Sequence, residues 1–229
     1  MHGEEGSDEV LCILPAKVDG VILTDHCVDD GYVLDLHRRH IPFVLLGREV
    51  EGTQVNANLP SSYRGAYEAV THLIQHGYGQ VAFIGGPRGS IHSKDRYRGH
   101  RQALQDHDAV RGEFKEDGGR QAMLQLLDLS EPPRAVFAAN DLMAIGALDA
   151  VRGRGLRVPD DIAVIGFDDI KLASYMEPPL TTVRQAIHEL GVLAVQVLLR
   201  CIKDPSVEAE STMLPTELVI RGSCGCGDN

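Results

Sequence analysis

The chain has 229 residues, long enough to bury a substantial core, and this length fits one large or two small α/β domains. Its formal net charge is −11, and basic residues gather only in short groups such as Arg96 to Arg98, so strong binding of nucleic acid by these residues is not expected. No apolar run approaches the length of a membrane span, and the first residues lack the features of a signal peptide. We therefore expect a cytoplasmic protein that does not contact the membrane.

The predicted elements of the first part of the chain alternate between strands and helices. In order, they are a helix at residues 7–14, a strand at 21–23, an amphipathic segment at 32–39, a strand at 43–46, a helix from Ser61 or Ser62 to His76, and a strand at 80–84. Alternation of this kind is typical of parallel sheets with helices on their faces.

The second part continues the alternation. It predicts a helix that carries Arg96, a short strand at 109–111, a helix at 118–129, an amphipathic helix that Gln185 opens and that runs to Ile202, and a strand at 214–222.

The clearest unit runs from Ala135 to Asp169. An unbroken apolar run at 135–139 predicts a strand buried on both faces, and Asn140 or Asp141 can cap the helix that follows and that ends near Gly153. A second apolar run at 162–165 predicts the next strand, which stops at the sequence Gly-Phe-Asp-Asp. The unit is thus strand, helix, strand, and both strands point the same way.

Short polar side chains follow both strands of this unit, Asn140 the first and Asp168 the second. Ligands of open parallel sheets bind outside the carboxyl ends of the strands, and an amide beside a carboxylate suits a polyhydroxylated ligand. The simpler interpretation is that Asn140 only caps a helix and that Asp168 only belongs to a turn.

The cysteines and the pair of histidines at 72 and 76 are the candidate metal ligands of the sequence. The number of cysteines is odd and their spacing indicates no disulfide framework: Cys12, Cys27, Cys201, Cys224 and Cys226. Cys224 and Cys226 lack the two further ligands of tetrahedral zinc. His72 and His76 share a helix face, yet no Glu lies between them as in metalloproteases, and His76 is interpreted as a helix C-cap. We expect no metal and no cofactor.

Three segments carry a resemblance to a known family. AANDLMAIGAL at 138–148, LRVPDDIAVIGFDD at 156–169 and PPLTTVRQ at 178–185 resemble, in this order and spacing, the effector-binding domain of the lactose-repressor (LacI/GalR) family of bacterial transcription regulators. The resemblance extends from Ser7 to Arg221. It implies an α/β fold of the type I periplasmic-binding-protein kind, in which three crossovers join two Rossmann-like, parallel-sheet lobes.

The resemblance also implies domain boundaries. The N-terminal subdomain is expected at residues 1–58 plus 184–205, and the C-terminal subdomain at 59–183 plus 206–229. The family places a helix-turn-helix headpiece, a strand and a long helix before the helix at 7–14. The sequence contains none of these, so the first lobe is expected to be incomplete and less stable than the second.

In this family an effector binds in a cleft between the lobes, and the resemblance assigns five residues to that site. Arg96 matches the arginine of an R-x-x-G motif, a group whose guanidinium forks onto hydroxyls or a carboxylate. Asn140, Asp168 and Gln185 match cleft-facing polar residues, and Phe114 matches an aromatic residue under the ligand. The alternatives are a solvated arginine for Arg96 and a helix-capping side chain for Gln185.

The implied function is that of a sugar-sensing domain of a homodimeric repressor, which reaches operator DNA only through the absent headpiece. Mixed donors and acceptors with one phenylalanine favour a neutral saccharide over a purine. One alternative is the sugar-binding component of a transporter, which would need a signal peptide. The other is an α/β enzyme, but residues 85–89 fit neither G-x-G-x-x-G nor the phosphate loop, and G-x-S-x-G is absent, so we expect no catalytic residues.

Overall fold

The computed structural model describes residues 18–24, 29–104 and 109–226. The chain divides into two compact units, which we call unit 1 (residues 1–60 and 186–214) and unit 2 (residues 61–185 and 215–229). The helix predicted at 7–14 lies outside the described residues, as do Cys12 and Cys27.

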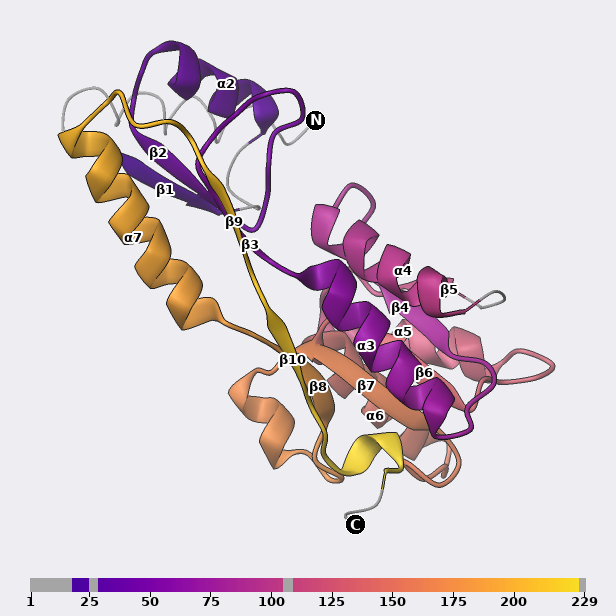
Figure 1. The fold of residues 1–229 in the computed structure, drawn as a ribbon. Coiled ribbons are helices and arrows are strands. Elements are labelled where there is room, and N and C mark those ends of the chain that lie inside the picture. The colour runs from indigo at the N-terminus through magenta and orange to yellow at the C-terminus, as the bar shows by residue number, and fades with distance from the viewer. Residues whose placement is uncertain (1–17, 25–28, 105–108, 227–229) are drawn as a thin grey trace. The chain divides into compact units, whose positions relative to one another are not determined.

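Unit 1 contains a four-stranded parallel sheet with the order β1-β2-β3-β9 (Figure 1). Its strands are β1 (Val21–Thr24), β2 (Phe43–Leu46), β3 (Ala57–Pro60) and β9 (Ser211–Leu214). Among its described residues, the helices are α2 (Asp30–Arg38), which the Asp29 side chain caps, and α7 (Ile187–Lys203).

Strand β2 divides the core of unit 1 between the two faces of the sheet. Phe43 and Leu45 belong to a cluster with Tyr32, Val33 and Leu36 of α2 and further side chains of the unit. The intervening Val44 belongs to a second cluster with residues of α7. This alternation follows from the period of two along a strand, and it gives unit 1 two small cores, one on each face.

Unit 2 contains a six-stranded sheet with the order β10-β8-β7-β6-β4-β5. The strands are β4 (Ala82–Gly85), β5 (Ala109–Arg111), β6 (Ala135–Ala138), β7 (Ala163–Asp168), β8 (Thr181–Gln185) and β10 (Thr216–Val219). Every pairing is parallel except that of β10 with β8, which is antiparallel. The carboxyl ends of the parallel strands therefore meet at one edge of the sheet, where open α/β sheets bind ligands.

Two helix pairs cover this sheet. Helices α3 (Ser62–Gln75) and α4 (Ile91–Ala103) pack against each other on one face, and α5 (Glu116–Leu127) and α6 (Asp141–Gly153) pack on the other (Figure 1). The short 3-10 helices η1 (Lys171–Tyr175) and η2 (Gly222–Cys224) complete the unit. A single large cluster of buried side chains runs through these layers.

Several predictions need correction. Strand β7 continues through Asp168 instead of stopping after Ile165, because Gly166 and Phe167 pair with β8. Gln185 ends β8 and does not open the following helix, which begins at Ile187.

The predicted strand at 214–222 is shorter in the structure, where β9 ends at Leu214 and β10 covers Thr216–Val219 after Pro215. Proline has no N–H for a strand ladder, and β9 and β10 join different sheets on either side of it. Residues 206–214 therefore belong to unit 1, and not to the C-terminal subdomain as predicted. Residues 59–60 also belong to unit 1, and 184–185 to unit 2.

None of the helices within the described ranges is both long enough and apolar enough to cross a membrane.

Candidate functional site

The polar residues predicted for the site gather at the carboxyl edge of the unit 2 sheet. Asn140 follows β6, Asp168 ends β7 and Gln185 ends β8, while Arg96 approaches the same edge from α4. Because the strands are neighbours and parallel, their ends bring these side chains together although they are far apart in the sequence.

Arg96 is almost completely buried, with 4% of its surface exposed. Its guanidinium donates a hydrogen bond to the carbonyl oxygen of Ala139, and its Cζ lies 3.8 Å from the centre of the Phe167 ring. The start of α4 is fixed by Ser90, whose hydroxyl accepts a hydrogen bond from the amide of Ser93. Arg96 is therefore not the solvated surface arginine of the alternative interpretation.

An ion pair joins Arg96 to Asp168, with 3.2 Å between Nη2 and Oδ1. The amide of Gln185 donates a hydrogen bond of 2.6 Å to the same oxygen. Within the described residues, the second oxygen of Asp168 accepts no hydrogen bond, and the side chain is 24% exposed. The cluster thus presents a carboxylate oxygen that a ligand hydroxyl can reach.

The electrostatics of this pair reflect its burial. Desolvation raises the pKa of Asp168, against the opposing effects of Arg96 and of the hydrogen bond from Gln185. Desolvation likewise lowers the pKa of Arg96, against the favourable charge of Asp168. Each charged group therefore depends on the other to offset the cost of its burial.

The backbone after β7 adopts an unusual conformation, with φ of 114° at Asp168 and 54° at Asp169. Asp169 holds this turn, since its carboxylate pairs with Arg184 at 2.7 Å and with Arg221 at 2.6 Å. Burial alone would raise the pKa of Asp169, but the hydrogen bonds from Arg221 and Arg184 outweigh it and lower the pKa. Strain of this kind persists only where the surroundings fix it, and it is typical of ligand sites.

Asn140 is the N-cap of α6, and its Oδ1 accepts a hydrogen bond of 2.9 Å from the amide of Met143. Its Nδ2 donates a hydrogen bond of 3.3 Å to the carbonyl of Phe114. Of the two predicted candidates for the cap, the structure thus selects Asn140. The same side chain also ties the loop that carries Phe114 to the edge of the sheet.

Phe114 lies in this loop between β5 and α5, with a positive φ of 58°. Its ring covers Gly86, where an added Cβ would lie 2.3 Å from the ring carbon Cζ. Gly86 follows β4, so the half-exposed ring lies at the same edge of the sheet as the polar cluster.

Asp141, predicted only as a possible helix cap, has a further role in the structure. The carboxyl group is completely buried, and it accepts hydrogen bonds from Thr182 at 2.5 Å and from the amide of Ile170 at 2.8 Å. Desolvation raises the pKa of Asp141 to about 7, against the lowering effect of these two hydrogen bonds. Its position close behind the buried strand β6 was the feature of the sequence that could have indicated its burial.

A pocket of about 380 Å³ opens beside the end of β4. It is lined by side chains of β4, α4 and β5, among them Phe83, Tyr97 and Arg111. None of the five predicted residues lines this pocket, so it is distinct from the cluster around Asp168.

Comparison with known proteins identifies the family of this architecture. The family model of the periplasmic binding protein-like domain matches residues 70–224. A probable HTH-type transcriptional repressor, ExuR of Bacillus subtilis (strain 168), is 38% identical over 219 residues, which are 92% of this chain and 66% of that relative. The chain therefore spans about two thirds of the length of this relative.

Solved structures agree with this match. A complex of the transcriptional regulator CelR with cellobiose has a TM-score of 0.89 and 33% identity, and the match covers 95% of this chain and 69% of that one. A LacI family transcriptional regulator from Enterococcus faecium with bound ribose has a TM-score of 0.82 and 30% identity, over 90% and 79% of the two chains. The chain belongs to the LacI family, as a domain of its periplasmic-binding-protein-like, effector-binding type. The relative from Bacillus is named as a repressor and not as an enzyme, in agreement with the prediction that the chain is no enzyme.

Proposed function

We propose that this chain is the sugar-sensing part of a bacterial transcription repressor, and that the cluster of Arg96, Asp168 and Gln185 contacts the effector. The observation that carries the proposal is the arrangement around Asp168. Arg96 and Gln185 both engage Oδ1, and the other carboxylate oxygen remains available to a ligand hydroxyl.

The chemistry of the cluster favours a saccharide. Asp168 supplies a charged acceptor, Gln185 and Asn140 supply amides, and Arg96 supplies a delocalised cation, a mixture that suits neighbouring hydroxyls of a sugar. The half-exposed ring of Phe114 adds a flat apolar surface of the kind on which the face of a sugar ring packs. The relatives solved with cellobiose and with ribose support the same class of ligand.

In such a regulator, the effector acts by its difference in affinity for two arrangements of the protein, which shifts the population that binds operator DNA. We propose that the complete protein binds DNA through a helix-turn-helix headpiece and that it acts in the cytoplasm as a homodimer. Support for self-association comes from η1, where Tyr175 is 71% and Leu172 47% exposed. A lower sedimentation coefficient for Tyr175→Ser would test that contact, and an unchanged coefficient would argue against it.

A thermal-shift screen of the reduced protein against mono- and disaccharides, with cellobiose and ribose included, tests the sugar proposal. A ligand present at 100 times its Kd stabilises a protein by about 2.7 kcal/mol, so a true effector gives a clear rise in Tm. The same screen on Asp168→Asn provides the specificity control, because this variant keeps the shape of the cluster and removes its charged acceptor. Shifts of equal size in both proteins would place the ligand elsewhere, and the lack of any shift across the saccharides would contradict the proposed ligand class.

A further inference from the structure

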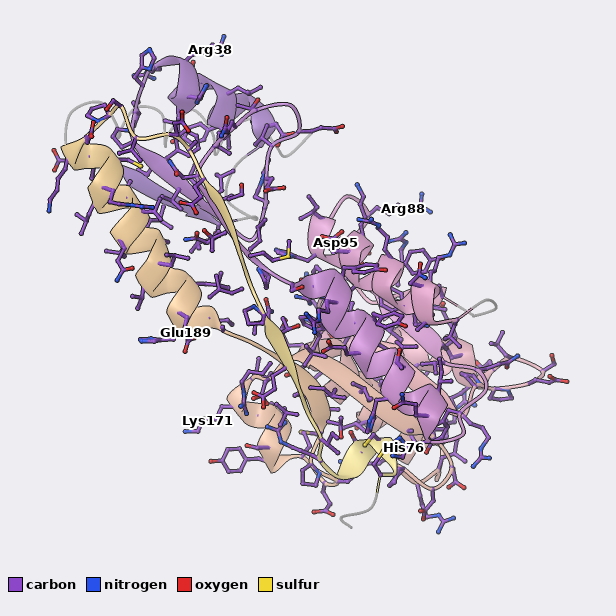
Figure 2. The ribbon with its side chains drawn as sticks, viewed as in Figure 1. Arg38, His76, Arg88, Asp95, Lys171 and Glu189 are labelled. Atoms are coloured by element: carbon purple, nitrogen blue, oxygen red, sulfur yellow. The ribbon has the colours of Figure 1, made fainter. Side chains whose placement is uncertain are left out.

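The structure brings His72 together with two cysteines, Cys224 and Cys226, that lie about 150 residues further along the chain. His72 lies in the last turn of α3, and Cys224 and Cys226 lie in and just after η2. The Sγ of Cys226 is 2.8 Å from Nε2 of His72, and the ligand atoms of all three residues lie within 4.8 Å of one another. Figure 2 labels His76, the C-cap of α3, whose ring neighbours that of His72.

We propose that His72, Cys224 and Cys226 form a binding site for a zinc ion. In the sequence the two cysteines lack the further ligands of a zinc site, and in the structure α3 supplies one of them. In a tetrahedral zinc site the bonds to sulfur and nitrogen are about 2.3 and 2.0 Å long, so ligand atoms lie roughly 3.5 to 3.8 Å apart. The observed separations, from 2.8 Å to at most 4.8 Å, lie on both sides of these values.

The donor set determines the class of metal. Two thiolates and one imidazole are soft or borderline ligands, which select zinc over magnesium or calcium. Two thiolates also neutralise a divalent ion, so the loaded site carries no net charge and suits its partly buried surroundings. Three protein ligands leave a fourth tetrahedral position for water.

The backbone that carries the thiols is held in place before any metal binds. Ser223 is completely buried, and its hydroxyl donates to the carbonyl of Val164 at 2.6 Å and accepts from the amide of Thr181 at 2.8 Å. Gly225 has a φ of 76°, and an added Cβ there would lie 2.7 Å from the hydroxyl of Tyr78. The left-handed glycine turns the chain between the two cysteines, and Tyr78 closes the space around it.

The imidazole is also held. The ring centres of His72 and His76 are 4.3 Å apart, and Nδ1 of His76 lies 2.8 Å from the carbonyl oxygen of His72. His76 thereby restricts the ring of His72 on the face of α3. A bound zinc ion would join the end of α3 to the C-terminal segment, and so would link two parts of unit 2 that are distant in sequence.

Cobalt substitution tests this site directly. The reduced, chelator-treated protein is titrated with Co²⁺, and we expect one equivalent to produce the thiolate charge-transfer band and the visible bands of tetrahedral cobalt, which Zn²⁺ then removes. Cys226→Ser and His72→Gln should lose these bands. Each should weaken zinc binding by more than the ten- to hundredfold loss that is typical for removal of an outer-shell partner.

Matched controls separate this site from other thiols and histidines. Cys201→Ser and His188→Gln, both in unit 1, should retain the cobalt spectrum and the zinc affinity of the parent protein. Circular dichroism establishes that each variant is folded, which is expected because His72 and Cys226 are only partly buried. A parent spectrum without a thiolate band, or one that survives both Cys226→Ser and His72→Gln, would overturn the proposal.

Discussion

The hydroxyl of Thr182 donates a hydrogen bond of 2.5 Å to Asp141, a carboxyl group that is completely buried at the start of α6. The amide of Ile170 donates to the other oxygen at 2.8 Å. Burial nevertheless dominates, and the pKa of Asp141 rises from 3.8 to about 7. The carboxyl group therefore holds a proton in the folded protein at pH values at which it is ionised in the unfolded chain.

This difference makes the stability depend on pH. Since the folded state binds the proton more tightly, the contribution of Asp141 is fully present below its unfolded pKa and is lost as pH rises toward 7. Asp141→Asn cannot ionise, and its amide retains an acceptor for Ile170 and a donor for Thr182. The free energy of unfolding of the variant, relative to that of the parent, should rise by up to roughly 3 kcal/mol between about pH 5 and about pH 8. Urea unfolding measures this difference. If the free energies of unfolding of the two proteins changed in parallel with pH, the raised pKa of Asp141 would be contradicted. Asp149→Asn, which removes a charge at an exposed ion pair, is the control.

The close approach of α5 and α6 predicts a strong effect of one methyl group. A Cβ on Gly146 would lie 2.0 Å from the carbonyl oxygen of Glu116, so Gly146→Ala forces the two helices apart. We expect a loss of roughly 1 to 3 kcal/mol in the free energy of unfolding. Gly153→Ala on the same helix is the matched control, because a Cβ there meets nothing within 4 Å and the alanine should be neutral or stabilising by up to about 1 kcal/mol. Equal effects at both positions would show that helix propensity, and not packing, decides the outcome.

At the candidate site, Asp168→Asn should reduce the affinity for the effector at least tenfold. Hydrogen bonds to a charged group contribute roughly 1.5 to 3 kcal/mol, and the variant removes the charge with little change of shape. Isothermal titration calorimetry with the saccharide found in the screen measures the change. Asp160→Asn, an exposed aspartate in the same unit, should leave the Kd unaltered. An unchanged Kd for Asp168→Asn would remove this residue from the site.

Arg96→Lys distinguishes charge from geometry at the same place. A lysine ammonium keeps the charge, but it cannot donate to Ala139 and to Asp168 with the planar fork of a guanidinium, nor stack on Phe167 in the same way. We expect weaker ligand binding and a lower Tm in the absence of ligand. A variant that binds and unfolds like the parent would mean that only the charge of Arg96 matters.

Native-state hydrogen exchange should distinguish the two units. Unit 1 has two small clusters on either side of four strands, and Ile22 on its edge strand β1 is 36% exposed, whereas unit 2 has one large continuous core. The amides of β4, β6 and β7 should therefore exchange most slowly, and those of β1 and β2 orders of magnitude faster. Equal protection of both sheets would contradict the expected difference in stability.

Much of the fold could be predicted from the sequence because its strongest signals are local. The strands at 43–46 and 109–111 have the predicted bounds, and the apolar run from Ala135 to Ala138 is a strand as its composition indicates. Predictions failed where pairing with a distant segment decides the structure. Gly166 looks like a turn residue in isolation, but β8 extends β7 through it.

At the candidate site too, local features could be predicted and contacts between distant residues could not. Asn140 and Asp168 could be predicted from their positions at strand ends, whereas Arg96 and Gln185 were predicted only from the family resemblance. The structure brings Asp168, Arg96 and Gln185 into contact. The hydrogen bond between Thr182 and Asp141 spans 41 positions, and the contact between His72 and Cys226 spans 154 positions. Periodicity carries no information about such pairs, because they arise only once the sheet and its covering helices have assembled.

The division of the chain at Pro215 has a consequence for synthesis. Strand β9 pairs with β3 of unit 1, and β10 pairs with β8 of unit 2, so both sheets gain a strand from residues 211–219. While the ribosome is still holding this part of the chain, β3 and β8 expose unpaired edges, and such edges recruit other strands. A nascent chain that stalls before Ser211 leaves both sheets without one strand and open to aggregation.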